Sequence, residues 1–319
     1  EKNFIIYNFV FDYVYKLIIK LKLDYLILDI KSFRKKNNLK EKKIIDLYES
    51  IKKPLIEINN QKLNDVMTNF KNFNKKDLIC FCNRDTAYKK KESPLTNMDY
   101  HNFRNFKIED FKISIKNLLE KNYFVARMGN IVEKKLELNN PNYYEFNQDI
   151  NKKPELEVML IKRSKFFVGA ESGLDKIALF LNKPIVYVNV HHLLYRPHFI
   201  NRCIFLPFKL FNLKNKTNLT FKQMLDENYL CNNEKTPVGL YYRTEDYINN
   251  NIKIIRNTSE EINSAIEEMQ FYLKNNFELS AHDKDLQQKF WNLFGIDFPL
   301  NKTHIISPKF LRTNLDLLY

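Results

Sequence analysis

The chain has 319 residues, with 52 Lys and Arg against 38 Asp and Glu, which gives a formal net charge of +14 at pH 7. Hydrophobic residues make up 44% of the chain, and it holds only five Gly and ten Pro, which excludes a disordered, collagen-like or linker-dominated protein. Four cysteines without a C-x-x-C spacing exclude a disulfide scaffold and the common zinc motifs. We therefore expect reduced thiols and no metal site, and the length predicts two domains.

The excess of basic residues has two explanations. One is a surface that faces an anion such as nucleic acid or an anionic membrane. The other is compositional bias, which is favoured because the lysines are spread along the whole chain. Neither a run of 18 apolar residues nor a signal-peptide pattern occurs, so we expect a soluble, cytoplasmic protein. Because the first residue is Glu rather than Met, we also expect further residues upstream.

The first 72 residues predict a small α/β unit. Its elements are expected at Phe4–Ile19 (helix), Tyr25–Ile30 (strand), Glu41–Ile51 (helix) and Leu55–Ile58 (strand). The Asn- and Lys-rich segment Asn69–Lys76 is the expected linker to the rest of the chain.

Residues 73–275 predict a larger, doubly wound α/β domain, because apolar runs alternate there with amphipathic stretches. Strands are expected at Leu78–Cys82, Tyr123–Arg127, Phe166–Gly169 and Ile185–Val190, and helices at Ile108–Lys121, Lys153–Arg163 and Leu174–Leu181. The pattern Thr258-x-x-Glu261 is a capping box and predicts a further helix to about Leu273. From Ser280 to Tyr319 we expect one more helix and an extended end.

The clearest candidate site is the strand-to-helix turn in Phe167-Val-Gly-Ala-Glu-Ser-Gly-Leu-Asp175. A helix that opens directly after a strand presents backbone N–H groups to an anion such as phosphate, where Ser172 adds a hydroxyl and Gly173 permits close approach. Glu171 can bind ribose hydroxyls or carry a proton, and Asp175 lies in the first helical turn. The alternative is a purely structural turn with Ser172 as the N-cap. The pattern matches neither G-x-G-x-x-G nor the phosphate loop of ATP hydrolases.

Two further strand ends carry polar residues. Asn83-Arg84-Asp85 follows the first strand of this domain, where Arg84 can pair with a diphosphate and Asp85 can orient it or act as a general base. An ordinary surface ion pair is the alternative. The run Arg127-Met-Gly-Asn130 ends the next strand, and the loop 101–105 supplies further polar candidates. We expect the three strands to be adjacent, so that these residues form a diphosphate site without a metal.

These motifs also carry a resemblance to a known family. The runs Ile79-Cys-Phe-Cys-Asn-Arg-Asp-Thr-Ala-Tyr88, Asn102-Phe-Arg-Asn105, Tyr123-Phe-Val-Ala-Arg-Met-Gly129, Phe167–Asp175 and Lys183-Pro-Ile-Val-Tyr-Val-Asn189 resemble a family of bacterial glycosyltransferases from surface-polysaccharide and cell-envelope gene clusters. The resemblance covers about residues 77–275. This chain departs from it at Phe81 or Cys82, where the family usually has a histidine, and near Glu171, where the family has a small residue, Thr or Ser.

The resemblance implies a GT-B-like architecture of two facing Rossmann-type units, of which the N-terminal one is small or truncated. Residues 1–72 would be the acceptor side and residues 73–275 the donor side, and the tail 276–319 would pack back on the first unit. The implied activity transfers a sugar from a nucleotide-diphosphate donor to a hydroxyl acceptor, without a cofactor or metal.

The resulting candidate residues fall into three groups. The catalytic carboxylates are expected to be Asp85 first and Glu171 second, with Asp175 third. Donor binding is assigned to Arg84, Arg104, Arg127, Gly129, Ser172, Gly173, Leu174 and Asp175, and the acceptor side to His101, Asn105, His191 and His192.

Three alternatives remain open. A non-catalytic binding protein for RNA or an anionic polymer would explain the basic charge, although no RNP-type motif is present. A transferase that binds a nucleotide sugar without turnover is the second. The third concerns His191–His198 and Phe205–Phe211, which either rest on the inner face of the cytoplasmic membrane, near a lipid-linked acceptor, or form a packed loop beside the cleft.

Overall fold

The computed structural model describes residues 54, 76–92, 94–95, 99–150, 152–191, 193, 202–225, 243–274, 277–294 and 304–319. All of them belong to one compact unit. The small unit predicted for residues 1–72 lies outside the described residues, apart from Pro54, and so does His192.

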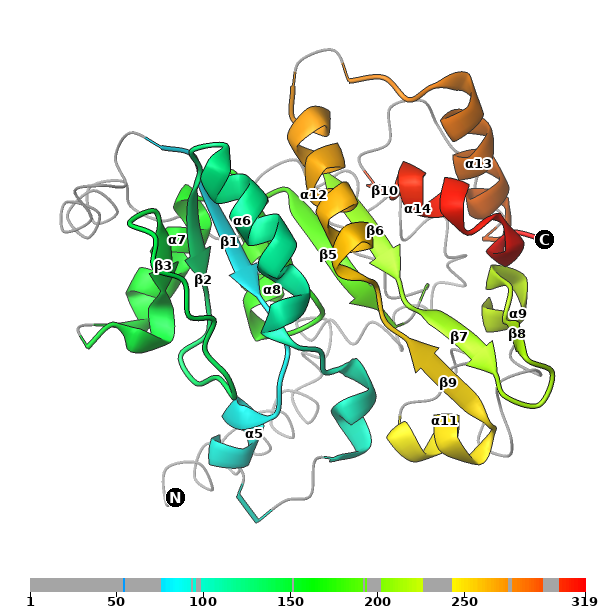
Figure 1. The fold of residues 1–319 in the computed structure, drawn as a ribbon, viewed down its shortest axis with the longest axis horizontal. Helices are drawn as coiled ribbons and strands as arrows, with labels where there is room; N and C mark the ends of the chain where they lie inside the picture. Colours follow the sequence, from blue (N-terminus) through cyan, green and yellow to red (C-terminus); the bar gives the residue numbers. More distant parts are fainter. Residues whose placement is uncertain are drawn as a thin grey trace, which may run out of the picture. The chain divides into compact units, whose positions relative to one another are not determined.

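A seven-stranded, fully parallel sheet forms the centre of this unit (Figure 1). Its order is β10-β6-β5-β4-β1-β2-β3. The strands are β1 (Leu78–Cys82), β2 (Phe124–Arg127), β3 (Tyr143–Glu145), β4 (Phe166–Gly169), β5 (Ile185–Val190), β6 (Cys203–Pro207) and β10 (His304–Ile306). Strands β1, β2 and β4 to β6 are buried along their whole length, as expected for a parallel sheet that is covered on both faces.

Helices cover the two faces of the sheet in separate layers (Figure 1). Helices α6 (Lys112–Glu120) and α12 (Ser259–Tyr272) pack together on one face, and α7 (Pro154–Arg163) and α8 (Gly173–Phe180) on the other. The predicted doubly wound α/β fold is therefore confirmed for this unit.

The predicted elements between residues 78 and 190 agree closely with the structure. Strands β1, β4 and β5 have the predicted bounds, and β2 begins one residue later than expected. The helix expected from Ile108 begins as a 3₁₀ turn, Ile108–Phe111, and becomes α-helical at Lys112. At α12 the capping box is confirmed, because the Thr258 hydroxyl accepts the Glu261 N–H and the Glu261 carboxylate accepts the Thr258 N–H.

A small antiparallel sheet, absent from the sequence-based prediction, follows β6. Its order is β8-β7-β9, formed by β7 (Lys209–Asn212), β8 (Thr217–Asn218) and β9 (Ile252–Ile255). The short helices beside it are α9 (Phe221–Leu225) and α11 (Thr244–Asn249). Its strands have two to four residues, too few for a clear alternation of apolar and polar positions.

The tail corrects a prediction. Instead of one helix and an extended end, it forms α13 (Ala281–Asn292), β10, α14 (Pro308–Thr313) and a 3₁₀ turn (Leu315–Leu317). Strand β10 pairs with β6 and forms one edge of the large sheet. Three residues are too few to predict a strand from the sequence, and β10 forms because its backbone groups find hydrogen-bond partners in β6. The predicted contact of the tail with residues 1–72 lies outside the described residues.

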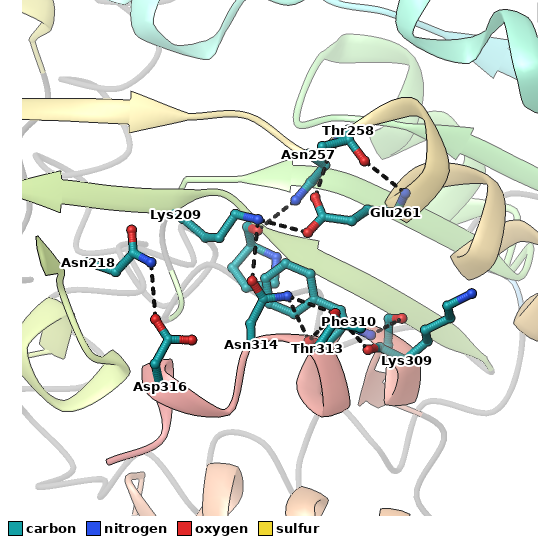
Figure 2. Close-up of polar contacts among 12 residues, drawn as sticks. Lys209, Asn218, Asn257, Thr258, Glu261, Lys309, Phe310, Thr313, Asn314 and Asp316 are labelled. Carbon is teal, nitrogen blue, oxygen red and sulfur yellow. Dashed lines mark hydrogen bonds and ion pairs between the residues drawn. The ribbon is translucent and has the colours of Figure 1, made fainter.

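Polar contacts tie the tail to the small sheet and to α12 (Figure 2). The Lys209 ammonium on β7 lies 2.8 Å from the Glu261 carboxylate and 3.3 Å from the Asn314 side-chain oxygen. The Asn257 amide donates to the Pro207 carbonyl, and its oxygen accepts the Asn189 N–H at 2.6 Å. These bonds connect the ends of β5, β6 and β9, which fixes the edge of the sheet where the loops emerge.

The aromatic segment after β5 does not support the membrane alternative where it is described. Phe205 and Phe208 are 0% and 2% exposed, and both belong to the core. None of the described helices is long and apolar enough to cross a bilayer. Membrane contact by His191–His198 stays a prediction, since most of that segment lies outside the described residues.

Candidate functional site

The topology of the large sheet marks one place as the natural binding crevice. From β1 the chain proceeds outward through β2 and β3 on one side, and through β4, β5 and β6 on the other. Loops after β1 and β4 therefore diverge, and ligands of doubly wound folds bind in the crevice between them. The prediction that β2, β1 and β4 are adjacent is confirmed by their parallel pairing.

Two adjoining cavities occupy this crevice. The larger cavity has a volume of about 860 Å³ and is lined by residues 82–85, 88–89, 101, 103–104, 128–132, 157, 171–174, 176–177 and 191. The smaller cavity has a volume of about 540 Å³ and is lined by residues 84–86, 89–90, 94–95, 99, 101–102 and 105. They share Arg84, Asp85, Lys89 and His101. The predicted strand ends thus meet around two cavities whose volumes are typical of small-molecule sites.

The turn between β4 and α8 forms one wall of the larger cavity. A methyl group at Gly173 would meet no atom within 4 Å, so the backbone there faces open space. Ser172 is the N-cap residue of α8, as the structural alternative predicts, but its hydroxyl is buried and has no hydrogen-bond partner in the described residues. Because the first N–H groups of a helix lack partners within it, this turn offers an anion both N–H donors and a hydroxyl.

Asp175 stabilises this turn through hydrogen bonds and does not line either cavity. Its carboxylate is fully buried, accepts the Ser172 N–H at 2.6 Å and accepts the Tyr187 hydroxyl at 2.7 Å. The structure therefore places Asp175 as a support of the turn, outside the reach of a ligand. Gly169 has a related role, since a Cβ there would lie 2.9 Å from the Cys82 carbonyl oxygen of the neighbouring strand.

Glu171, His191 and Arg104 form a buried polar group at the other end of this wall. The His191 Nδ1 lies 2.5 Å from the Glu171 carboxylate, and the Arg104 guanidinium donates to the Glu171 backbone carbonyl at 2.9 Å. Burial raises the pKa of Glu171, but the charge and hydrogen bond of His191 and the charge of Arg104 outweigh burial, so the net pKa is lowered. Glu171 is therefore held ionised and already paired. The Arg104 Nε is buried without a partner in the described residues.

Arg84, His101 and Asn105 meet where the two cavities join. One Arg84 nitrogen donates to the His101 carbonyl at 3.2 Å and to the Asn105 side-chain oxygen at 3.3 Å. Burial and the positive charge of Arg104 lower the pKa of Arg84 to about 10. Burial and the charges of Lys89, Arg104 and Arg84 lower the pKa of His101 to about 4, so its imidazole is neutral at pH 7.

Asp85 is held in a fixed orientation on the wall that both cavities share. One carboxylate oxygen accepts the Ala87 N–H at the start of α5 (Ala87–Glu92), and the other accepts the Glu133 N–H, both at 3.0 Å. A carboxylate has about four lone-pair sites, so each oxygen retains one for a ligand. Asp85 is thus both a structural link and an accessible carboxylate.

Arg127 does not line the cavities, although the sequence assigns it to donor binding. Its side chain is 0% exposed, forms an ion pair with Glu145 and donates to the Asn83 side chain and the Lys134 carbonyl. The guanidinium does not reach the cavities, because it pairs with the buried Glu145 carboxylate on the neighbouring strand β3. Arg127 therefore supports the loops after β1 and β2.

Two residues that shape the site, Glu157 and Arg256, were missed at the sequence level. The Glu157 carboxylate on α7 accepts the Gly129 N–H at 2.7 Å and lines the larger cavity, and burial raises its pKa despite that hydrogen bond. Gly129 has a φ of +115°, which only glycine adopts without strain. Arg256, at the end of β9, donates to the carbonyls of Asn105 and Phe103 and fixes the loop that carries Arg104. No local motif signals these long-range contacts.

The remaining predicted residues are placed as follows. Gly129, Ser172, Gly173 and Leu174 line the larger cavity with Glu171 and His191, Asn105 lines the smaller one, and His192 lies outside the described residues. Within the described ranges, no group of three or more His, Cys, Asp and Glu side chains is placed to hold a metal ion.

Comparisons with known proteins give partial structural likeness only. No protein-family model and no curated protein matches the chain. The ADP-heptose LPS heptosyltransferase II of E. coli is similar with 19% identity and a TM-score of 0.33, over 47% of this chain and 44% of that one. The dodecameric iron-containing heptosyltransferase TibC, in complex with ADP-D-β-D-heptose, is similar with 17% identity and a TM-score of 0.32, over 63% of this chain and 47% of that one. This chain thus spans less than half the length of either.

Proposed function

We propose that the protein is a glycosyltransferase that moves a sugar from a nucleotide-diphosphate donor to a hydroxyl acceptor in the synthesis of a bacterial surface glycan. The observation that carries the proposal is the larger cavity at the switch point of the sheet. It combines the N-terminal turn of α8, the unpartnered Ser172 hydroxyl and the Arg104 guanidinium on one wall. This combination is the chemistry that a diphosphate requires.

The rest of the larger cavity suits the nucleoside. Its lining also includes apolar side chains, Met128, Ile131 and Val132 after β2 and Leu174 and Ile177 on α8. A nucleobase gains binding energy against such side chains, while the diphosphate stays at α8 and Arg104. The donor sugar then lies toward Arg84 and Asp85, where the two cavities join.

The same residues can carry out the transfer. As the acceptor oxygen forms a bond to the anomeric carbon, the bond from that carbon to the diphosphate breaks and its electron pair remains on the phosphate oxygen. Arg104, Arg84 and the α8 turn stabilise this developing charge by electrostatics. The acceptor hydroxyl loses its proton to a carboxylate.

Asp85 is the better placed general base. It lies on the shared wall, is oriented by two backbone N–H groups and keeps free lone pairs. Glu171 is already paired with His191 and has a lowered pKa, which weakens it as a base. We assign Glu171 to positioning Arg104 and His191. The absence of a metal requirement, the cytoplasmic location and peripheral membrane contact remain parts of the proposal.

A thermal-shift screen tests the donor site, because a ligand that binds only the folded protein raises its melting temperature. The ligands are UDP, GDP, ADP, CMP and their sugar conjugates. We expect one nucleotide class to stabilise the protein, and we expect Arg104→Gln and Ser172→Ala to reduce that shift. Arg163→Gln is the matched control, since Arg163 is exposed and outside both cavities.

No shift with any nucleotide at millimolar concentration would contradict the donor site. Binding of RNA or an anionic polymer, with a steep salt dependence and no nucleotide effect, would then favour the non-catalytic binding protein. Nucleotide-sugar binding without release of the nucleoside diphosphate, in the presence of acceptors, would favour a transferase that has lost turnover.

A further inference from the structure

The smaller cavity contains more unpaired positive charge than the donor site explains. Arg84, Lys89 and Lys90 line it, and within the described ranges none of the three forms an ion pair. Lys90 lines only the smaller cavity, whereas Lys176, which forms an ion pair with Asp175 at 3.0 Å, lines only the larger one. The two cavities thus have separate cations in addition to the shared ones.

The cations in this region act on one another. Burial and the positive charges of Arg84 and Arg104 lower the pKa of Lys89, and no carboxylate among the described residues offsets this effect. His101 is surrounded in the same way, and its Nδ1 is buried without a hydrogen-bond partner in the described residues. Like charges so close together destabilise one another, and a bound anion would remove that repulsion.

The acidic residues nearby are already engaged. Both oxygens of Asp85 accept backbone N–H groups, and Glu171 is paired with His191 and Arg104. Asp99, the other acid in the smaller cavity, accepts the Asn102 side-chain amide at 2.9 Å. These carboxylates moderate the positive field without neutralising Arg84, Lys89 and Lys90 directly.

We propose that the smaller cavity binds a sugar acceptor through an anionic substituent, a phosphate monoester or a carboxylate, held by Lys89, Lys90 and the unpartnered His101 Nδ1. This rests on the proposed function, because the donor in the larger cavity defines the smaller one as the acceptor side. A volume of about 540 Å³ admits a charged monosaccharide unit. The shared residues Arg84 and Asp85 then lie between donor and acceptor, where the proton is removed.

The test compares three ligands on the full chain at constant ionic strength. Glucose 6-phosphate and glucuronate represent the two anion types, and glucose is the uncharged control. Binding is followed by calorimetry with and without the nucleotide diphosphate found in the donor screen. We expect at least one charged sugar to bind about tenfold more tightly than glucose, with the nucleotide already bound.

Two lysine variants separate the cavities. Lys90→Gln is expected to lower the affinity for the charged sugar about threefold or more and to leave the affinity for the nucleotide unchanged. Lys176→Gln is expected to lower the affinity for the nucleotide and to leave the affinity for the charged sugar unchanged. Lys116→Gln, an exposed lysine on α6, is the control and should change neither.

A second readout is the His101 imidazole, assigned in NMR spectra by His101→Asn. The charged groups around this ring are Lys89, Arg84, Arg104 and His191, with the carboxylates of Asp85, Asp99 and Glu171 close by. A bound anion favours the imidazolium, so the pKa of His101 should rise from about 4 when the charged sugar is added.

The inference is overturned if neither charged sugar binds more tightly than glucose. It is also overturned if the nucleotide displaces the charged sugar and, of the two lysine variants, only Lys176→Gln lowers the affinity for that sugar. In the second case the anion belongs to the donor site and the proposed function stands. If no nucleotide binds but Lys90→Gln still weakens the charged sugar, the anion site stands and the proposed function fails.

Discussion

At the residue scale, most of the polar residues that the sequence singles out gather around the two cavities. Arg84, Asp85, Gly129 and Glu171 closely follow buried strands, and parallel strands end at one edge of a sheet, so their position is predictable. Arg127 and Asp175 are the exceptions. Their burial depends on Glu145 and Tyr187, partners from other strands that no motif connects to them. The roles of the lining residues stay predictions.

Arg127 and Arg104 should therefore differ sharply when each is changed to Gln. Arg127→Gln leaves the buried Glu145 without its ion pair and should cost about 3–5 kcal/mol of unfolding free energy. Arg104→Gln removes a hydrogen bond to the Glu171 carbonyl but leaves Glu171 paired with His191, so it should cost about 1–2 kcal/mol and mainly reduce nucleotide affinity. Urea unfolding and calorimetry measure both quantities. A stable Arg127→Gln protein with impaired nucleotide binding would contradict this assignment.

His101 should make the folded protein sensitive to mild acid. Its pKa of about 4 in the folded state lies below the ordinary value of 6.5, so the unfolded chain binds more protons between these values. Stability should therefore fall as the pH decreases from about 6.5 to 4, and His101→Asn should flatten part of that decrease. Denaturation curves at pH 7 and pH 5 measure it, with exposed His282→Asn as the control. An equal loss in the wild type and His101→Asn would refute the expectation.

At the element scale, the strands and helices that alternate between residues 78 and 190 were largely predictable, whereas β3, β6, β10 and the small antiparallel sheet were not, although β6 is a buried strand of five residues. Strands β1, β4 and β5 are continuous apolar runs, and α12 carries a capping box. Strand β3 has the sequence Tyr-Tyr-Glu, and its place in the sheet comes from pairing with β2. Arg256 at the end of β9 shows the consequence, because an unpredicted element holds the loop that presents Arg104.

Replacing Gly169 or Gly173, which flank the turn between β4 and α8, by alanine should affect different properties: stability at Gly169 and nucleotide binding at Gly173. Gly169→Ala places a methyl group 2.8 Å from the Phe167 ring and 2.9 Å from the Cys82 carbonyl of β1, and should cost about 1–3 kcal/mol. Gly173→Ala meets nothing and should fold normally, but its methyl group should weaken nucleotide binding several-fold. Melting temperature and nucleotide affinity measure the two effects. Equal stability of both variants would contradict the packing described.

At the scale of the whole molecule, the tail is part of the large sheet and not an appendage. Sequence patterns predicted the parallel α/β class but not this closure, because β10 reaches β6 across a separation of about 100 residues. The Gln287 amide on α13 donates to the Ile306 carbonyl at 2.6 Å, and Phe290 contacts the rings of Phe205 and Phe221. The tail and the sheet therefore share one core.

Phe290→Ala should therefore destabilise the whole described unit. Removing this fully buried ring should cost about 3–5 kcal/mol, in a single unfolding transition detected equally by fluorescence and circular dichroism. Phe271→Ala on α12 is the control, because that ring is 54% exposed and its loss should cost far less. A separate early transition for the tail would show that it folds independently of the sheet.

The most direct test of the donor site is a crystal structure with the nucleoside diphosphate that gives the largest thermal shift. We expect the diphosphate against the first turn of α8, within hydrogen-bond distance of the Gly173 N–H, the Ser172 hydroxyl and the Arg104 guanidinium. The nucleobase should contact the apolar lining residues Met128, Ile131 and Ile177. A nucleotide bound elsewhere, with this turn empty, would contradict the account.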